Sequence, residues 1–177
     1  KLSLADNIAL TKRVLAVARA VGVSVEAEIG KIGGTEDDIT VNEWEANMTE
    51  PLEAKEFAEA TGVDALAIAI GTAHGQYKGT PKLDFERLKK VRELISIPIV
   101  LHGSSGVPDD AIAKAIELGV RKVNIDTNLR EAFVAGVREV LARDAKEIDP
   151  RKVLGPAKQK MSGVIREKIR LFGSSGK

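Results

Sequence analysis

Two patterns of apolar residues alternate along this chain. Short, mainly apolar runs, typical of buried strands, lie within 23–29, 63–71, 97–102 and 120–126. The stretches around them repeat their apolar residues at helical spacing. Strands that alternate with amphipathic helices predict a parallel sheet covered by helices, and therefore an α/β fold.

The first helix is predicted over 4–22, with Asp6 as its N-cap and Gly22 as its stop signal. It is expected to bury one apolar stripe spaced at i, i+4, i+7 and i+11, formed by Leu10, Val14, Val17 and Val21. Further N-caps are predicted at Thr49, at Asp84, and at Asp126 or Thr127.

The segment between Gly30 and about Pro51 is rich in Gly, Asp, Glu and Asn. About 20 residues is long for a connection between a strand and a helix. The composition and length together predict a mobile functional loop.

Polar residues that could act as ligands or catalytic groups follow the apolar runs. Glu28 ends the first run, His74 follows the second, His102 follows the third, and Asn124 begins a polar motif after the fourth. In parallel α/β proteins the carboxyl ends of the strands form the edge where ligands bind. We therefore expect a functional site at this edge.

The two histidines of the sequence, His74 and His102, occupy equivalent positions at predicted strand ends. Two converging imidazoles are a natural part of a Zn²⁺ site, which uses three protein ligands when one position stays open for substrate. The alternative is that each histidine forms only local hydrogen bonds. A third ligand would be Glu28, or a residue outside this chain.

Two motifs are candidates for binding phosphate. The run Gly103-Ser104-Ser105-Gly106 combines small residues and hydroxyl donors ahead of a helix, which suits an anion; an ordinary loop is the alternative. The run Asn124-Ile125-Asp126-Thr127 offers donors after the next strand, with a helix cap as the alternative.

Two further residues are weaker candidates. Glu36 follows the pair Gly33-Gly34, which could hinge a carboxylate over the site as an acid or base; a solvated acidic loop is the simpler interpretation. Arg151 could contact a second phosphate, although exposed arginines are common.

Four strands are consistent with a small open sheet or with half of a (β/α)₈ barrel, which needs eight strands and about 250 residues. Barrel enzymes commonly bind phosphate with the loops after the last two strands. Because the phosphate-like motifs follow the last two runs here, the pattern favours the C-terminal half of a barrel.

Composition narrows the function classes. The 177 residues include 27 Lys and Arg, 26 Asp and Glu, and no Cys, which gives a net charge of +1. This balance gives no reason to expect nucleic acid or a membrane surface as partner, and no disulfide or thiolate metal site is available. A cytoplasmic location fits this composition.

Several motifs, in order, resemble those of the class II, metal-dependent fructose-bisphosphate aldolases, including the related tagatose-bisphosphate aldolases. The glutamate-bearing strand and following loop are similar over 25–30 and 33–38, and the two metal-histidine strands over 62–75 and 101–106. The phosphate-binding signature is similar over 124–127. The resemblance implies a (β/α)₈ TIM barrel, of which residues 1–177 would be the C-terminal half, without the N-terminal strands.

The resemblance also implies roles for individual residues. His74 and His102 would bind the catalytic Zn²⁺, with Glu28 as an alternative or auxiliary ligand, and the metal would act as a Lewis acid on dihydroxyacetone phosphate. Glu36 would move protons at the nascent enediolate, and Arg151 would reach the distal phosphate across a subunit interface. The motifs expected to hold the substrate and its phosphate, often with a monovalent cation (Na⁺ or K⁺) nearby, contain Gly75, Gly103, Ser104, Ser105, Asn124, Ile125, Asp126 and Thr127.

One departure from the family pattern stands out. Family members carry an Asp-His pair on an earlier strand, and this sequence contains no Asp-His dipeptide. We therefore expect a truncated copy of an aldolase that binds metal weakly and catalyses poorly or not at all. The full-length form is expected to be a homodimer or homotetramer that cleaves a ketose bisphosphate into triose phosphates.

Two alternatives remain open. One is tagatose rather than fructose bisphosphate as substrate, since the two sugars differ only at C4. The other is a non-catalytic phosphate-binding half-barrel that associates with a partner, because open edge strands are normally covered.

Overall fold

The computed structural model describes residues 2–31, 33–36, 39–41, 48–75 and 79–177. The chain folds into two compact units, Lys1–Asn124 and Ile125–Lys177.

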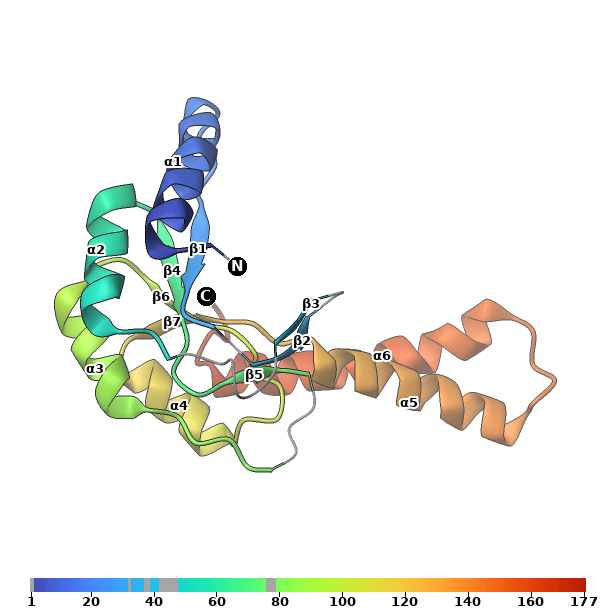
Figure 1. Ribbon diagram of the computed structural model, residues 1–177. Coiled ribbons are helices and arrows are strands. Elements are labelled where there is room, and N and C mark those ends of the chain that lie inside the picture. The colour runs from blue at the N-terminus through green and yellow to red at the C-terminus, as the bar shows by residue number, and fades with distance from the viewer. Residues whose placement is uncertain (1, 32, 37–38, 42–47, 76–78) are drawn as a thin grey trace. The chain divides into compact units, whose positions relative to one another are not determined.

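The first unit is built on a four-stranded sheet in which all strands are parallel (Figure 1). In spatial order its strands are β1 (Glu26–Ile29), β4 (Ala65–Ile68), β6 (Ile99–Leu101) and β7 (Val120–Val123). The connecting helices are α2 (Pro51–Thr61), α3 (Phe85–Leu94) and α4 (Asp109–Glu117). The alternation predicted from the sequence is confirmed, although each strand is shorter than its apolar run.

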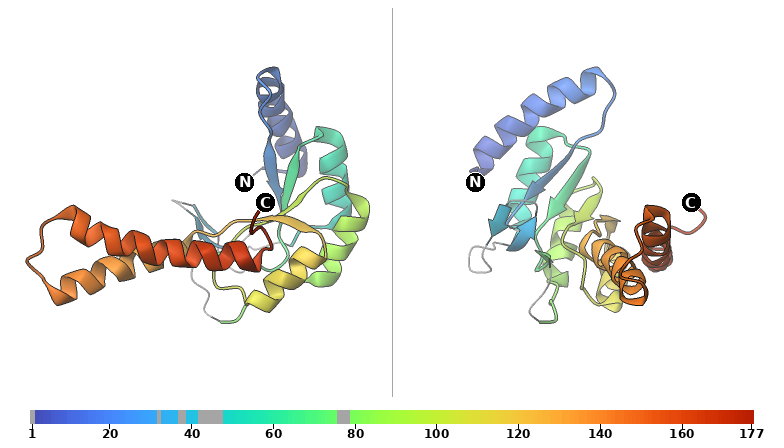
Figure 2. Two further views of the ribbon diagram at one scale, coloured as in Figure 1. Left: turned by 180° about the vertical axis from the view of Figure 1, so that it is seen from behind. Right: turned by 90° about the vertical axis from the view of Figure 1, so that its right-hand side faces the viewer.

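The core of this unit lies between the sheet and its helices, as the two further views show (Figure 2). Leu66 and Ile68 of β4 are fully buried, and so are Phe57 of α2 and Leu88 and Val91 of α3. Central strands of a parallel sheet are covered on both faces, so their sequences are continuous apolar runs. This burial explains why the strand positions could be read from hydrophobicity.

Helix ends follow the sequence signals in part. The Asp84 side chain accepts a hydrogen bond from the backbone N–H of Arg87 and caps α3, as predicted. The prediction that Thr49 caps α2 is wrong, because Glu50 occupies the N-cap without a side-chain bond. The buried Thr49 hydroxyl instead donates to the carbonyl of Ile29 (2.8 Å) and accepts from the N–H of Ala69 (2.9 Å), so it joins the chain at the ends of β1 and β4.

The first helix, α1 (Leu4–Ala20), corrects two predictions. Its N-cap is Ser3, whose hydroxyl accepts from the N–H of Asp6. Its buried residues are Thr11 and Leu15, whereas the predicted buried stripe is exposed at Leu10, Val14, Val17 and Val21.

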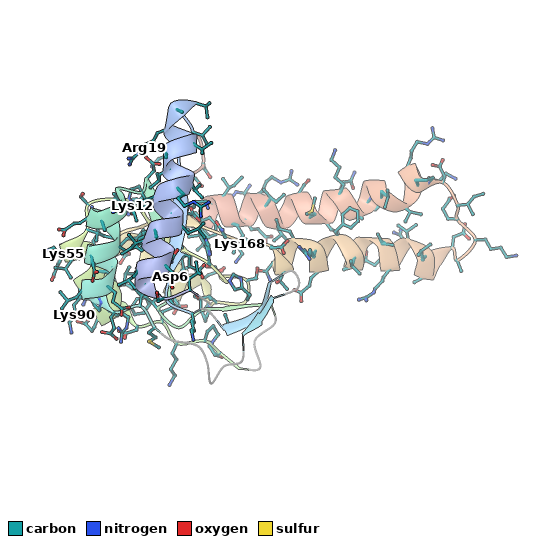
Figure 3. All side chains as sticks on the ribbon, turned by 45° about the horizontal axis from the view of Figure 1, so that its top comes forward. Asp6, Lys12, Arg19, Lys55, Lys90 and Lys168 are labelled. Atoms are coloured by element: carbon teal, nitrogen blue, oxygen red, sulfur yellow. The ribbon has the colours of Figure 1, made fainter. Side chains whose placement is uncertain are left out.

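The physical reason is that α1 carries apolar residues on two stripes. Helical periodicity alone cannot say which stripe contacts the sheet and α2. Figure 3 shows polar side chains such as Lys12 and Arg19 along the same helix, between its apolar positions.

The segment after β1 contains strands that the sequence analysis did not predict. Strands β2 (Gly33–Glu36) and β3 (Ile39–Val41) pair antiparallel, and β2 also pairs in parallel with β5 (Ala73–His74). Part of the predicted loop is therefore a small second sheet. Residues 32, 37–38 and 42–47 of this segment lie outside the described residues.

The second unit is a pair of helices, α5 (Thr127–Arg143) and α6 (Pro150–Leu171), which run antiparallel (Figures 1 and 2). Asp149 caps α6 through its side chain, whereas the N-cap of α5, Asp126, makes no side-chain capping bond. The helices approach closely at the buried Gly136, where an added Cβ would lie 2.5 Å from the Cα of Ala157. Within the described parts of the chain, no helix is both long enough and apolar enough to cross a membrane.

Candidate metal centre

One face of the four-stranded sheet carries the polar residues of the site. Cross-strand partners share a face, and the register pairs Glu26 with Ala65 and Glu28 with Ala67. Ala67 in turn pairs with Val100, and Val100 pairs with Lys122. The small alanines of β4 leave room above the sheet for the longer polar side chains of its neighbours.

Three side chains of this unit come together at the ends of their strands. Glu28, His74 and His102 each offer one ligand atom, and these atoms lie within 4.8 Å of one another. All three residues are half-buried. Among the described residues, this is the group of three or more histidine and acidic side chains close enough to hold a metal ion.

The backbone explains why two histidines meet here. His102 directly follows β6, whereas His74 lies in β5, beyond the end of β4, and not at the end of a single long strand as predicted. Gly103 has φ +61°, and a Cβ there would lie 2.5 Å from the carbonyl oxygen of Ala73. The glycine thus permits the close approach that sets the two imidazole centroids 6.1 Å apart.

His102 contacts a carboxylate at each ring nitrogen. Its Nδ1 lies 2.6 Å from Oε2 of Glu28, and its Nε2 lies 2.9 Å from Oε1 of Glu26. The hydrogen bond to Glu28 raises the pKa of His102, and the Glu26 bond adds to this, while partial burial acts in the opposite direction. The surroundings therefore favour a positive charge at this position, which a proton or a metal cation can supply.

Glu26 and Lys122 belong to this network and were missed by the sequence analysis. The Lys122 ammonium donates to Oε2 of Glu26 at 2.8 Å. Burial opposes ionisation of Glu26, yet the hydrogen bonds from Lys122 and His102 outweigh it and lower the pKa of Glu26. The spacing of Glu26 and Glu28 was the available signal, because residues two apart in a strand share a face.

In the run 103–106, one serine hydroxyl is already hydrogen-bonded to a backbone carbonyl. Ser104 and Ser105 are both buried, and the Ser104 hydroxyl donates to the carbonyl of Leu101 at 3.4 Å. Gly75 is half-buried next to His74. Gly103 and Ser105 take part in further interactions of their own.

The other predicted site residues lie at the end of the first unit or in the second unit. The first unit ends with Asn124, and the second begins with Ile125, Asp126 and Thr127. Asp126 pairs with Arg130 at 2.9 Å. Arg151, also in the second unit, is exposed and pairs with Asp149 at 2.8 Å.

The catalytic candidate Glu36 ends β2, but its side chain lies outside the described part of the structure. Its strand is nevertheless hydrogen-bonded to the strand of His74, with Gly34 paired to His74. The backbone of Glu36 is therefore two residues beyond the partner of a candidate ligand.

Comparison with known proteins decides the family. The model of the class-II fructose-bisphosphate aldolases matches residues 1–177. The chain belongs to this family. Its α/β fold is that of part of the (β/α)₈ barrel found in these aldolases.

Two solved structures illustrate the similarity. The YdjI aldolase from Escherichia coli K12 is 38% identical with a TM-score of 0.83, covering 99% of this chain and 59% of that one. The fructose-bisphosphate aldolase of Campylobacter jejuni is 27% identical with a TM-score of 0.78, covering 97% of this chain and 57% of that one. This chain thus spans a little under three fifths of the length of these aldolases.

The donor set fits the metal that the aldolase family implies. Two imidazoles and one carboxylate are ligands that Zn²⁺ accepts, and three protein ligands leave a fourth position open. Half-burial of all three residues keeps the cluster open to a small molecule.

Proposed function

We propose that this chain carries the metal-binding and substrate-binding residues of a zinc-dependent aldol lyase. The reaction would be the reversible cleavage of fructose 1,6-bisphosphate into dihydroxyacetone phosphate and glyceraldehyde 3-phosphate. The observation that carries the proposal is the meeting of Glu28, His74 and His102 above a parallel sheet in a chain of the aldolase family. Residues 1–177 would form the C-terminal half of the barrel.

Glu28, His74 and His102 would hold the Zn²⁺. When bound, this ion supplies Lewis-acid polarisation of a carbonyl group. Glu28 lies in β1, His74 in β5 and His102 directly after β6, so the backbone of the first unit sets their spacing before any ligand arrives. Preorganised ligands of this kind need little rearrangement on binding.

In the cleavage direction Glu36 would deliver a proton to the carbon next to the carbonyl of the dihydroxyacetone phosphate portion, and in the reverse, condensation direction it would remove that proton. The pairing of Gly34 with His74 supports this role, because it ties the strand of Glu36 to the strand of a metal ligand.

The phosphate groups would be held by donors from two motifs. Gly75, Gly103, Ser104 and Ser105 offer backbone N–H groups and hydroxyls ahead of α4, and the run 124–127 offers a second set. Arg151 would contact the distal phosphate, and Na⁺ or K⁺ would bind near the substrate. Because these roles rest on the family resemblance, each has to be tested by a substitution of the residue concerned.

The 177-residue chain is proposed to bind Zn²⁺ weakly and to turn over slowly or not at all. Its sequence has no Asp-His pair to supply a further ligand and a further acid-base group. In a longer chain that contains this sequence and that pair, we expect a cytoplasmic homodimer or homotetramer with full activity.

Calorimetric titration with Zn²⁺ tests the proposal on the chain itself. We expect one Zn²⁺ per chain, with binding abolished by either His74→Ala or His102→Ala and unchanged by Glu53→Gln on the exposed side of α2. Dihydroxyacetone phosphate is expected to bind only to the zinc-loaded chain. Phosphate-ester binding that does not depend on Zn²⁺ would favour the non-catalytic alternative.

The same variants test the reaction in a longer chain that includes this sequence. Release of triose phosphate from fructose 1,6-bisphosphate should be sensitive to EDTA and lost in both histidine variants. Activity that survives EDTA and both substitutions would overturn the proposal. Faster cleavage of tagatose 1,6-bisphosphate would instead identify this C4 epimer as the preferred substrate.

A further inference from the structure

Glu26 lies beside the metal cluster without belonging to it. Glu28 approaches Nδ1 of His102 at 2.6 Å, whereas Glu26 approaches Nε2, on the other side of the ring, at 2.9 Å. The two carboxylates therefore contact different nitrogens of one imidazole. Glu28 is among the grouped ligand atoms, and Glu26 is not.

The chemistry of imidazole makes this contact consequential. A neutral histidine carries one N–H, and only the nitrogen without it has a lone pair for a metal. In the neutral ring that binds a metal, a carboxylate that accepts from Nε2–H leaves the lone pair on Nδ1, the nitrogen that faces Glu28. Metal-binding histidines usually have such a partner, which fixes both the tautomer and the ring orientation.

Lys122 fixes the carboxylate in turn. Its ammonium donates to Oε2 of Glu26 at 2.8 Å, which leaves Oε1 directed at His102. Lys122 comes from β7 and Glu26 from β1, the two outer strands of the four-stranded sheet. The pair therefore spans the sheet above the small side chains of Ala65 and Ala67, on the face that carries the site.

We propose that Glu26 is a positioning residue that accepts the Nε2–H of His102 and so presents Nδ1 to the metal, and that Lys122 holds Glu26 in this role. The inference rests on the proposed zinc site and adds two residues to it. Neither residue touches the metal or the substrate. The competing explanation is an ion pair that merely ties β1 to β7.

The exposure of the pair separates these explanations. The side chain of Lys122 is 52% exposed and that of Glu26 is 26% exposed. Ion pairs this open to water contribute little to folding stability. A role in stability alone therefore predicts small effects everywhere, whereas a role in orientation predicts a large effect on metal affinity at nearly constant stability.

The experiment combines two readouts on the 177-residue chain: Zn²⁺ affinity from a competitive chelator titration, and the His102 tautomer from long-range ¹H–¹⁵N correlation spectra of the zinc-loaded chain. In Glu26→Ala we expect the Zn²⁺ Kd to rise about 10- to 100-fold. The His102 spectrum should change from the Nε2–H form to a tautomer mixture. The Tm of the metal-free chain should remain close to that of the parent.

Conservative variants and a matched control complete the design. Glu26→Gln retains an oxygen acceptor for Nε2–H, so it should weaken Zn²⁺ binding less than Glu26→Ala does. Lys122→Met should also weaken Zn²⁺ binding, and Lys122→Arg should weaken it less. Glu50→Gln breaks an ion pair of similar length, with Arg87 at 2.9 Å, on the helical side of the same unit. It should change neither readout.

The outcomes are distinguishable. Parental zinc affinity in Glu26→Ala, or weakened affinity with an unchanged His102 tautomer, would overturn the positioning role. A parent chain that binds no Zn²⁺ at all would overturn the proposed metal site itself. Loss of affinity together with the tautomer change would support the inference.

Discussion

At the scale of single residues, the candidate centre depends on short backbone contacts as much as on its ligands. His102 and His74 meet because Gly103 allows the chain after β6 to pass against the carbonyl of Ala73. A left-handed backbone conformation and a contact that excludes a Cβ are two separate reasons for glycine at this position. A change here should therefore affect the metal centre without removing a ligand.

The variant Gly103→Ala tests that role. The new Cβ would lie 2.5 Å from the oxygen of Ala73, so β5 must shift and carry His74 away from His102. We expect a loss of about 1–3 kcal/mol in unfolding free energy and weaker Zn²⁺ binding. Urea unfolding and zinc titration measure the two effects.

Gly79→Ala is the matched control, because Gly79 has no atom within 4 Å of an added Cβ and no positive φ. It should leave both quantities near their parental values. Equal unfolding free energies and equal Zn²⁺ affinities in the two variants would contradict the packing role of Gly103.

Residue identity at the strand ends was readable from the sequence, and the finer network was not. Histidines and a glutamate that interrupt apolar runs are conspicuous, so Glu28, His74 and His102 could be singled out. Glu26 and Lys122 look like ordinary exposed positions of short strands. Only the register, which stacks them on one face with His102, reveals that they interact.

At the scale of elements, α1 shows how periodicity can choose the wrong face. Apolar residues recur on two stripes, and the stripe with Thr11 and Leu15 packs inward. The valine-rich stripe is exposed, with Val17 71% accessible and Leu15 only 2% accessible. Choosing between them requires knowledge of where β1 and α2 lie, which the sequence of the helix does not contain.

A pair of substitutions checks the orientation of α1. Leu15→Ala should lower the unfolding free energy by about 2–5 kcal/mol because it leaves a cavity in a buried position. Val17→Ala should change it by no more than about 0.5 kcal/mol. Chemical denaturation of both variants, followed by circular dichroism, gives the comparison, and a larger effect at Val17 would reverse the assigned face.

The contact between α5 and α6 supplies a second element-scale prediction. An added Cβ at Gly136 meets the backbone of Ala157, so Gly136→Ala should push the helices apart and cost about 1–3 kcal/mol. Gly163→Ala, within α6, meets no atom within 4 Å and should stabilise the chain by up to about 1 kcal/mol through helix propensity. Thermal unfolding resolves these opposite signs, and changes of the same sign would contradict the packing.

The connection between α5 and α6 should make the second unit sensitive to acid. The backbone N–H of Asp149 and the ammonium of Lys152 lower the pKa of Glu147, and Arg151 lowers the pKa of Asp149. A lowered carboxyl pKa stabilises the folded form above the ordinary value of about 4. That stabilisation is lost as the pH falls through the lowered pKa.

Glu147→Gln should therefore flatten the decline in stability between about pH 5 and the acid limit. Unfolding free energies measured at a series of pH values for the parent and the variant test this. An identical pH dependence in both chains would show that Glu147 does not contribute.

At the scale of the whole molecule, the sequence supported the fold class better than the details of the chain between strands. Four apolar runs alternating with helices predicted a parallel α/β sheet, and the family comparison confirms part of a (β/α)₈ barrel. The hairpin of β2 and β3 was missed, because it is rich in glycine and polar residues and carries no strong apolar alternation.

The central claim is that Glu28, His74 and His102 bind one metal ion together. X-ray absorption at the zinc edge of the loaded chain tests it most directly. We predict two imidazole nitrogens at about 2.0–2.1 Å and a carboxylate oxygen, and no zinc retained by the His102→Ala chain after the same loading. A spectrum without imidazole scattering, or one unchanged by that substitution, would contradict it.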